Sequence, residues 1–298
     1  MKLVKTFIKN FRSINSCTVL NGKISALVGE NNPGKSAVLR ALNSFFNYEQ
    51  EESNFSSGLH QYSKKSLVRV ELTFTEVPSI DKYAQMLNND ELIIRMTYSA
   101  KTKKRTLHYK KNGTYETLSN DFINLLKEDI NYILIPPNRD HRQVVWEENT
   151  LLKTVLEEYL RKHTSRRGNL TPKVIVAAKN LENNALSKVE AEVDKYYSMN
   201  RNFKFKFNFD KQIDYSLLLN DITLDIEERG QVYNITESGS GIQSLTIIAL
   251  YRYLAELKHN NIILGIEEPE INLHPQAQRE FITSISKEQL LRWNPILS

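Results

Sequence analysis

The sequence predicts an α/β fold built around a strand, a glycine loop and a helix, and two observations lead to this prediction. An apolar, β-branched run at residues 24–28 is typical of a buried strand, residues 31–34 interrupt it, and residues 36–46 carry apolar side chains at helical spacing. A second apolar run at residues 262–266 ends at two adjacent carboxylates. The chain has 298 residues, of which 40% are hydrophobic and 25% charged, so it can bury a core and global disorder is excluded.

The first half of the chain alternates apolar and polar residues, which predicts strands. Residues 3–9 form one such strand, and a second at Val19 and Leu20 precedes Asn21-Gly22, a pair typical of hairpin turns. Residues 50–63 are polar and predict a mobile loop. Three further alternating segments predict an antiparallel meander, and an apolar run predicts a buried strand that two prolines end. These segments are residues 67–75, 92–98 and 105–110 for the meander and 130–135 for the buried strand.

After residue 150 the period becomes helical. One apolar stripe covers residues 151–160 and a second covers 178–196, with a polar break at 164–169. We expect the two helices to form an insertion beside the main sheet. Residues 203–209 alternate Phe with Lys or Asn, which predicts a strand with one aromatic face. The predicted divisions are an N-terminal lobe at 1–139, a helical insertion at 140–202 and a C-terminal lobe at 203–298.

Composition limits the classes of partner. Lys and Arg number 40 against 35 Asp and Glu, a formal charge of +5, which permits nucleic acid as a partner without requiring it. Cys17 is the single cysteine, so a disulfide within the chain and a Cys-rich zinc site are excluded. No apolar run approaches the ~18 residues of a membrane span. Lys2 and Lys5 interrupt the N-terminus too early for a signal peptide. The sequence therefore predicts a cytoplasmic protein with no membrane partner.

Residues 29–36 read G-E-N-N-P-G-K-S and match the phosphate-binding pattern G-x-x-x-x-G-K-[ST] between a strand and a helix. The glycines let backbone N–H groups close around phosphates, and the helix N-terminus adds partial positive charge. Lys35 can reach the β- and γ-phosphates, and the Ser36 hydroxyl can hold Mg²⁺. The alternative is a strand–helix turn that merely contains glycine. The predicted nucleotide-binding residues of this segment are Gly29, Asn31, Asn32, Gly34, Lys35, Ser36 and Ala37.

Glu267 and Glu268 stand at the C-terminal end of the predicted strand 262–266. In an α/β sheet that binds phosphate, this edge faces the ligand. One carboxylate can hold Mg²⁺, directly or through water, and the next can polarise an attacking water. The usual fate of a Glu-Glu pair is a solvated acidic turn, but a phosphate loop in the same chain favours the functional interpretation.

A third motif, Ser238-Gly239-Ser240-Gly241, precedes a predicted helix at 242–257 that is apolar almost all round. Two hydroxyls and two glycines at a helix N-terminus make an anion site. One nucleotide does not need two such sites, whereas a head-to-tail dimer does, because each chain could cap the γ-phosphate bound by its neighbour. The alternative is a Ser/Gly N-cap on a buried helix.

The segment Asn10-Phe11-Arg12-Ser13 followed by the phosphate loop resembles the opening of SMC/RecF-type ABC ATPases. Residues 267–275 read E-E-P-E-I-N-L-H-P and resemble the OLD (overcoming lysogenization defect) family of ATPases found in bacterial defence systems. Between these motifs the resemblance extends to the order of elements. It implies a P-loop NTPase of ABC/SMC type with a mixed sheet, an antiparallel β subdomain and a helical insertion, and it implies ATP and Mg²⁺ as cofactors.

The resemblance also implies residue roles. It places Glu267 at the metal position and Glu268, with Lys35, in the catalytic set, and it implies two nucleotides between the subunits of a homodimer. Residues 238–241 take the signature position, although Leu-Ser-Gly-Gly-Gln is absent and either serine can be the one that meets the γ-phosphate. Arg12 is implied as a further nucleotide contact. Residues 272–274 fall in the loop that faces the partner, and residues 136–139 lie near where a Q-loop is expected, without a glutamine.

One departure from the family concerns the C-terminal segment. The family continues with an apolar strand ending in Thr-His-Ser, which supplies a switch histidine, whereas no histidine follows His274 here. Residues 296–298 match only the start of that strand. We therefore expect the central strand of the sheet to be missing and the fold to be weakened. The TOPRIM nuclease domain of OLD proteins has no counterpart either, so the chain is expected to be a fragment, a shortened product or a subunit completed by another protein.

Two basic stretches make DNA a candidate partner, although a solvated face is the commoner role of such stretches. The first surrounds a predicted hairpin and the second ends the first inserted helix. Their members are Lys101, Lys103, Lys104, Arg105, Lys110 and Lys111, and Arg161, Lys162, Arg166 and Arg167.

The sequence as a whole predicts an ATPase whose ATP-dependent dimerisation controls an effector acting on nucleic acid, in DNA repair or anti-phage defence. The rival hypothesis is an ATP-binding scaffold that does not hydrolyse and that regulates a separate toxin or nuclease. The lack of a switch histidine favours the rival, and Glu268 favours the enzyme. A transporter ATPase is disfavoured by the loose signature motif.

Overall fold

The computed structural model describes residues 1–29, 34–63, 66–78, 81–139, 142, 150–196, 222–228, 230–258, 261–271, 273–287 and 293–297. The chain divides into two compact units, the first made of residues 1–140 and 239–298 and the second of residues 141–238. Asn31, Asn32, Asn272 and the predicted strand at 203–209 lie outside the described residues.

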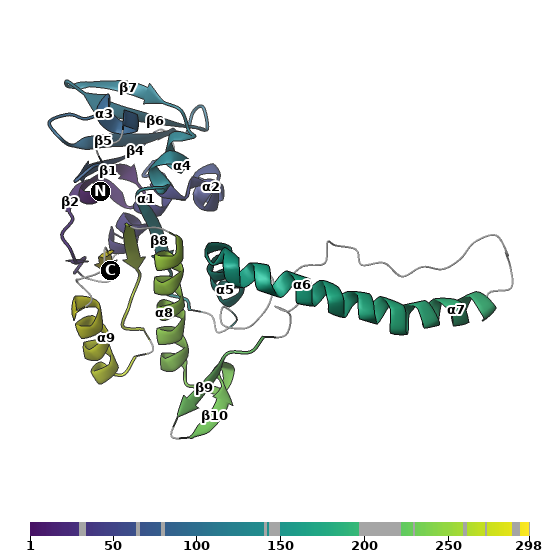
Figure 1. The fold of residues 1–298 in the computed structure, drawn as a ribbon. Helices are drawn as coiled ribbons and strands as arrows, with labels where there is room; N and C mark the ends of the chain where they lie inside the picture. Colours follow the sequence, from purple (N-terminus) through teal and green to yellow (C-terminus); the bar gives the residue numbers. More distant parts are fainter. Residues whose placement is uncertain are drawn as a thin grey trace. The chain divides into compact units, whose positions relative to one another are not determined.

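A six-stranded antiparallel sheet in the order β2-β1-β4-β5-β6-β7 forms one layer of the first unit (Figure 1). The predicted meander is confirmed, and β7 adds a strand that alternation alone did not indicate. The strands are β1 Lys2–Phe11, β2 Ile14–Leu20, β4 Leu67–Thr75, β5 Leu92–Ser99, β6 Lys104–Lys111 and β7 Thr114–Leu118. One face of this sheet is buried and apolar, with Ile8, Val70 and Ile94 among its residues, so the sheet covers the core on that side only.

A four-stranded parallel sheet in the order β3-β12-β11-β8 forms the second layer. Its strands are β3 Ser25–Ala26, β12 Trp293–Leu297, β11 Ile262–Ile266 and β8 Asn131–Ile135. The α/β fold class is thereby confirmed. The expectation that the central strand is missing is wrong, because β12 lies between β3 and β11, with Ile266 opposite Leu297 and Ile296 opposite Ser25. β12 has only five residues, but it pairs with β3 and β11 along their whole lengths because those strands are also short.

Helices cover both faces of the parallel sheet. Along β11 the side chains alternate, so that Ile263 joins the core around α1 (Gly34–Phe46) while Leu264 and Ile266 pack with Ile248 and Phe281. The last two residues belong to α8 (Ser240–Lys258) and α9 (Pro275–Lys287). The predicted helix at 242–257 is thus confirmed. Helix α1 lies between the two sheets, and its apolar side chains supply much of the shared core.

A close packing of β8, β11 and α1 depends on one glycine. The Tyr132 hydroxyl on β8 donates to the Leu39 carbonyl on α1 at 3.0 Å. A Cβ at Gly265 on β11 would lie 2.0 Å from the Tyr132 hydroxyl oxygen, so only glycine leaves room for this tyrosine. Tyr132 also stacks on Phe46, with 6.1 Å between ring centroids. These contacts set the position of α1, which begins at the predicted phosphate loop.

Two local predictions are wrong. Residues 48–56 form a helix, α2 (Tyr48–Ser56), where a mobile loop was expected, because Glu51 and Phe55 share one buried face of an otherwise polar segment. Asn21-Gly22 is not a hairpin turn between adjacent strands, since β2 and β3 belong to different sheets. Asn21 instead anchors to β1, where its backbone N–H donates to the Val4 carbonyl at 2.9 Å and its side-chain amide to the Thr6 hydroxyl at 2.9 Å.

The remaining short helices of the first unit are α3 (Asp81–Ala84) and α4 (Phe122–Lys127). The buried Tyr83 of α3 donates its hydroxyl hydrogen to Asp129 at 2.6 Å, just after α4.

The second unit contains α5 (Leu151–Lys162), α6 (Thr164–Leu181), a π-helical segment at Glu182–Leu186 and α7 (Ser187–Tyr196). The prediction of a helix at 151–160 is confirmed. The polar break expected at 164–169 is wrong, because α6 already begins at Thr164 and its polar first turns are exposed, where helix-compatible polar residues need no apolar stripe. A hairpin of β9 (Asp225–Glu228) and β10 (Gln231–Asn234) leads to a short 3₁₀ turn at Ile235–Glu237.

Candidate functional site

The strand–loop–helix arrangement that the sequence predicts is present on both sides of the loop, whose residues 30–33 are not described. Gly29 follows β3, and α1 begins at Gly34. The Lys35 ammonium donates to the Gly29 carbonyl at 2.8 Å and so connects the first turn of α1 to the residue that follows β3 and the segment after it. A Cβ at Gly29 or Gly34 would meet none of the described atoms within 4 Å, so the described residues leave space beside both backbones. Ala37 is fully buried in the core, so its side chain is not available to a ligand.

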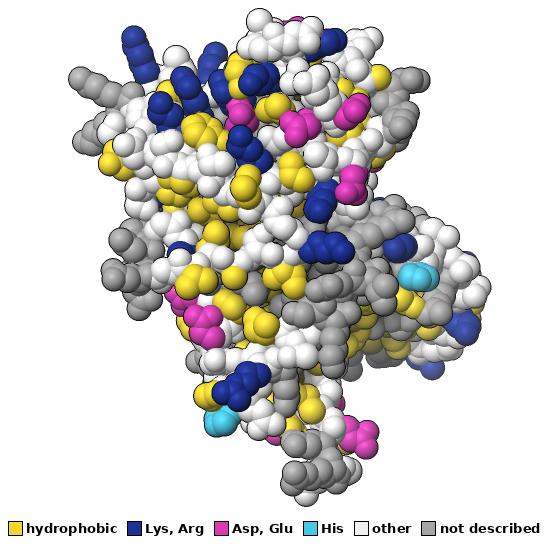
Figure 2. Space-filling view, turned by 90° about the vertical axis from the view of Figure 1, so that its left-hand side faces the viewer, with side chains coloured by type: hydrophobic (Ala, Val, Ile, Leu, Met, Phe, Trp, Pro, Cys, Tyr) yellow, Lys and Arg dark blue, Asp and Glu magenta, His cyan; other side chains and the backbone are white. Residues whose placement is uncertain are grey.

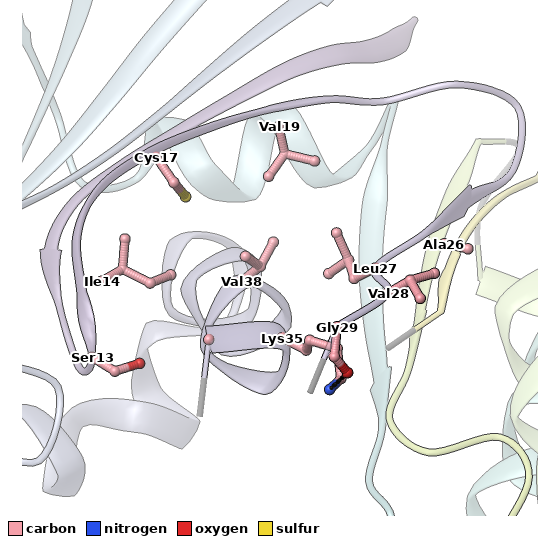
Figure 3. Close-up of a pocket in the computed structure, with 11 residues that line it drawn as sticks. Ser13, Ile14, Cys17, Val19, Ala26, Leu27, Val28, Gly29, Lys35 and Val38 are labelled. Atoms are coloured by element: carbon pink, nitrogen blue, oxygen red, sulfur yellow. Dashed lines mark hydrogen bonds between the residues drawn. The ribbon is translucent and has the colours of Figure 1, made fainter. Parts of the chain in front are cut away.

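A pocket of about 750 Å³ opens beside this loop, between β2 and the start of α1. Figure 3 shows Cys17 and Val19 of β2 facing Val38 of α1 across the pocket, with Lys35 and Gly29 at its end. Most of its lining is apolar, and the polar side chains among its lining residues are those of Ser13 and Lys35, with the thiol of Cys17. Such a pocket suits a ligand with a flat, weakly polar part and an anionic part. The complete lining is Ser13, Ile14, Cys17, Val19, Ala26, Leu27, Val28, Gly29, Gly34, Lys35 and Val38.

Partial burial raises the pKa of the Cys17 thiol above its usual value. The thiol is therefore largely protonated at neutral pH and behaves as a small apolar group in this lining.

Glu267 lies at the end of β11 and is 3% exposed. Its backbone N–H continues the sheet by donating to the Ile135 carbonyl at 3.0 Å, and its carboxylate accepts from the Arg40 guanidinium of α1 at 3.3 Å. Burial raises the pKa of Glu267, and the positive charges of Arg40 and Arg12 oppose this rise. The carboxyl group is thus buried next to two cations, whose charges favour its ionised form.

Arg40 also reaches a second buried carboxylate. Its guanidinium lies 3.3 Å from Glu51, which accepts further hydrogen bonds from Asn43 at 2.6 Å and Asn54 at 2.8 Å. Arg40 and Asn43 contact Oε1, whereas Asn54 and the His60 ring, which lies 2.7 Å away, contact Oε2. Burial favours the neutral form of Glu51, but the hydrogen bonds outweigh it and lower its pKa to about 2. Arg40 therefore links one firmly ionised carboxylate to the carboxylate at the end of β11.

The same cluster supports the turn that carries Arg12. His60 stacks on Phe11 with 4.7 Å between ring centroids, and its carbonyl accepts from the Arg12 backbone N–H at 3.4 Å. Asn10 and Arg12 both have positive φ, at 57° and 49°, so this β1–β2 turn depends on such support. Arg12 is close enough to Glu267 to lower its pKa, which places it on the same side of the site.

Glu268 differs from its neighbour in being exposed and in having a φ of 45°, which is unusual for a residue with a side chain. Its carbonyl accepts from the Ile271 N–H at 3.1 Å, which closes the acidic turn. Arg139, 9% exposed and just beyond β8, donates to the Glu267 carbonyl at 2.8 Å and to the Glu268 carbonyl at 3.1 Å. Its other terminal nitrogen donates to the Ser244 hydroxyl of α8 at 2.9 Å.

The third motif is divided between the two compact units. Ser238 ends the second unit, and its hydroxyl donates to the Ile235 carbonyl at 2.6 Å. Ser240 and Gly241 are the first residues of α8 in the first unit, and the Gly239 carbonyl accepts the first helical N–H groups. Among the described residues that line the pocket, none comes from this motif, from Glu267 and Glu268, or from Arg12.

The donors that the sequence assigns to Mg²⁺ fit that ion. Ser36 and Arg40 are four residues apart on α1 and so share a face, which places the Glu267 carboxylate toward the face that carries the Ser36 hydroxyl. A hydroxyl and a carboxylate are oxygen ligands of the kind Mg²⁺ prefers, and it usually completes its shell with water and substrate phosphates. Within the described parts of the chain, no group of three or more His, Cys, Asp or Glu side chains is arranged for a metal.

The predicted basic cluster does not form one patch. Lys101, Lys103 and Lys104 lie at one end of β6 and Lys110 and Lys111 at the other, while Arg105 places its guanidinium 4.5 Å from the Tyr48 ring centroid. Arg161 is paired with Glu158 at 2.6 Å, and the side chains of Arg166 and Arg167 lie outside those described.

A different set of cations shares one face of the antiparallel sheet. Strand register places Lys9 opposite Arg69 on the face away from α1, where Arg95 also lies, paired with Glu71 at 2.8 Å. In Figure 2, Lys and Arg side chains gather in the upper part of the view, where this sheet lies.

No helix in the described part of the chain is both long and apolar enough to cross a membrane.

Sequence reasoning missed Arg40, Glu51, His60 and, in any definite role, Arg139. The available signal was weak. Arg40 is a charge within the apolar stripe of α1, and Arg139 follows an apolar strand and two prolines. Neither pattern indicates which residue the arginine contacts. Glu267 is 227 residues from Arg40, and Glu268 is 129 residues from Arg139.

Comparison with known proteins gives a family and a fold. The AAA ATPase domain family matches residues 1–145 and 138–288. No curated protein matches the chain. Solved structures similar to it include Stu0660 of Streptococcus thermophilus, with 12% identity over 98% of this chain and 68% of that one and a TM-score of 0.53.

Two further structures have nearly the same extent. The Smc head domain of Pyrococcus furiosus, solved with an extended coiled coil and the C-terminal domain of ScpA, has 12% identity over 99% of this chain and 89% of that one, with a TM-score of 0.52. The recombination mediator protein RecF with ATP has 14% identity over 99% of this chain and 92% of that one, also with a TM-score of 0.52. At these identities the likeness concerns the fold.

Proposed function

The chain belongs to the AAA ATPase domain family, and on this premise we propose that it binds MgATP at the loop of residues 29–36 and hydrolyses it between two subunits. The observation that carries the proposal is the apolar pocket of about 750 Å³ that ends at Lys35. The base and sugar would lie against β2 and Val38, and the phosphates would extend toward the N-terminus of α1.

In this proposal Lys35 exchanges its contact with the Gly29 carbonyl for the β- and γ-phosphates. Arg12, Gly29, Asn31, Asn32, Gly34 and Ala37 surround the same nucleotide. Ser36 and Glu267 hold Mg²⁺, which would neutralise phosphate charge. The charge of Arg40 favours the ionised form of the buried Glu267 and orients its carboxylate, and the position of Arg40 is itself fixed by Glu51.

Glu268 is proposed as the carboxylate that accepts a proton from the attacking water. Its exposure suits this role, since a general base must reach a water next to the γ-phosphate. Glu267 is already engaged with Arg40, so the two adjacent carboxylates have different environments and different tasks.

We also propose that Ser240 and Gly241, with Ser238, meet the γ-phosphate bound by a partner copy. The exposed start of α8 offers unpaired helix N–H groups, and none of these residues lines the pocket of its own chain. Closure of a homodimer on ATP follows from this arrangement. The OLD-type pattern at 267–275 supports an effector that acts on nucleic acid, in repair or anti-phage defence, carried by a separate subunit. The cation-bearing face of the antiparallel sheet favours DNA as a partner.

Three substitutions test the enzymatic core of this proposal. Lys35→Ala should weaken MgATP binding about tenfold or more, since a charge-assisted contact contributes ~1.5–3 kcal/mol. Glu268→Gln should bind MgATP as the parent does and lose hydrolysis, and Glu267→Gln should raise the Mg²⁺ concentration required. Calorimetry and a phosphate-release assay measure these effects. Parent-like affinity in Lys35→Ala, or parent-like turnover in Glu268→Gln, would refute the respective assignment.

The rival function, an ATP-binding scaffold without hydrolysis, makes a different prediction in the same assay. The parent would then bind MgATP through Lys35 and release no phosphate, and Glu268→Gln would be indistinguishable from it.

A further inference from the structure

Arg139 joins three segments that are far apart in the sequence. It follows β8, its partners Glu267 and Glu268 follow β11, and its third partner Ser244 lies in α8. All three segments belong to the first compact unit. The guanidinium is nearly buried, and the pKa of Arg139 is lowered by burial while Glu270 and Glu268 act in the opposite sense. A buried cation is costly, so its three hydrogen bonds need to compensate for its burial.

The two carbonyls that Arg139 holds belong to consecutive residues of the acidic turn. Glu268 has a φ of 45°, a backbone conformation that residues with a side chain disfavour. Such a conformation persists only where the surrounding structure holds it in place. One terminal nitrogen, Nη2, donates to both carbonyls while the other, Nη1, donates to Ser244, so the planar guanidinium fixes the two carbonyls and the contact with α8 together. Arg139 therefore sets the direction in which the exposed Glu268 carboxylate leaves the backbone.

The bond to Ser244 connects this turn to the helix that begins at Ser240. Ser244 is 1% exposed and lies one turn into α8, on the same face as Ser240. A helix moves as a rigid element over such a distance, so a displacement of its N-terminal end is passed to Arg139 through the hydroxyl. No other described hydrogen bond involves the Ser244 hydroxyl.

We propose that Arg139 is a positioning residue for hydrolysis, which holds Glu268 in its left-handed turn and couples that turn to the start of α8. This inference rests on the proposed function, in which Glu268 activates water and Ser240 and Gly241 meet the partner's nucleotide. Engagement of the start of α8 then aligns Glu268 in the same subunit. Arg139 itself touches neither the nucleotide nor the water.

Steady-state kinetics of Arg139→Met, Arg139→Lys and Ser244→Ala test the catalytic side. Arg139→Met should lower kcat at least about tenfold while KM for ATP and MgATP affinity stay within about threefold, because the nucleotide contacts are untouched. Arg139→Lys should rescue little, since the single nitrogen of an ammonium cannot take the positions of both Nη2, which holds the carbonyls, and Nη1, which holds Ser244. Ser244→Ala should lower kcat less than Arg139→Met does, because the carbonyl contacts remain.

The matched control is Arg105→Met, which removes a second, half-buried arginine that packs on Tyr48 in the antiparallel part of the unit. Arg105→Met should lose thermal stability without any change in kcat. A parent-like kcat in a folded Arg139→Met, or an equal loss of kcat in both variants, overturns the inference.

Amide hydrogen exchange without nucleotide separates this inference from the proposed function. Arg139→Met and, to a lesser degree, Ser244→Ala should speed exchange at Ile271 and Leu273 and in the first turns of α8, with no change in β4 and β5. Unchanged exchange in the acidic turn overturns the positioning role whether or not the parent hydrolyses ATP. If the parent releases no phosphate but exchange changes in the variants as described, the proposed hydrolysis is refuted. Arg139 then remains the link between the acidic turn and α8.

Discussion

The Glu51 carboxylate stays ionised although its side chain is 1% exposed, because Asn43, Asn54, His60 and Arg40 all contact it. Its pKa falls from an ordinary value of 4.5 to about 2. A depressed carboxyl pKa contributes stability in full above the unfolded value and loses it as the pH falls toward the folded value. The contribution of Glu51 should therefore be present above pH 4.5 and vanish near pH 2.

Glu51→Gln tests this in urea unfolding at several pH values. The variant should be less stable at neutral pH, by an amount on the order of 3 kcal/mol, and its stability should change less between pH 4.5 and 2 than that of the parent. The matched control is Glu52→Gln, the same change at an exposed neighbour, which should follow the parent. Parallel pH curves for the parent and Glu51→Gln would contradict the account of this cluster.

Cys17 offers a direct probe of the pocket because it is the only thiol in the chain and lines the cavity. Alkylation by iodoacetamide near pH 8.5, where more of a thiol with a raised pKa is ionised, should be slowed by MgATP in proportion to the bound fraction. Lys35→Ala should lose this protection. Mass spectrometry of the labelled chain gives the rates, and equal rates with and without saturating MgATP would place the nucleotide elsewhere.

At the scale of elements, the contact between β11 and β8 depends on the absence of a side chain at residue 265. Gly265→Ala would bring a methyl group to 2.0 Å from the Tyr132 hydroxyl, and overpacking of this kind costs ~1–3 kcal/mol. Thermal unfolding should show a lower Tm for Gly265→Ala, partly restored when Tyr132→Phe removes the nearest atom. Gly168→Ala, where a Cβ meets nothing within 4 Å, is the control and should not lower stability. A parent-like Tm for Gly265→Ala would show that the strands shift freely here.

Elements with strong local periodicity could be predicted from the sequence, and others could not. The strand before Gly29, the helix after Gly34 and the meander each carry their own pattern. Helix α2 was missed because only Glu51 and Phe55 are buried, and one of these is a carboxylate whose burial depends on partners from elsewhere. The parallel strand β12 was underestimated because its place between β3 and β11 is a matter of tertiary pairing.

The site shows the same division. Contiguous motifs indicate their own chemistry in the sequence, and these motifs contain Lys35, Ser36 and the Glu267–Glu268 pair. The roles of these residues stay predictions. Arg40 and Arg139 act through distant carboxylates and carbonyls, and a lone arginine in a sequence does not reveal its acceptor. Local patterns therefore predict the groups that touch a nucleotide, whereas the groups that orient them require the fold.

At the scale of the whole molecule, the proposed site is incomplete in one chain. The pocket ends at Lys35, while Ser240 and Gly241 begin a helix outside its lining. A nucleotide that contacts both motifs therefore contacts Lys35 of one copy of the chain and Ser240 and Gly241 of a second copy. It then favours the dimer by the free energy of these extra contacts. The structures of the Smc head and RecF share this fold, and the arrangement of two copies of this chain is our proposal.

The central claim, that ATP joins two copies through the start of α8, is tested most directly by the mass of Glu268→Gln in light scattering with and without MgATP. This variant keeps its nucleotide, so the account predicts a monomer without MgATP and a dimer with it. Gly241→Asp in the same background should remain monomeric, because a negative side chain would face the γ-phosphate, while its MgATP binding through Lys35 persists. A monodisperse monomer of Glu268→Gln at saturating MgATP would contradict the shared-site account.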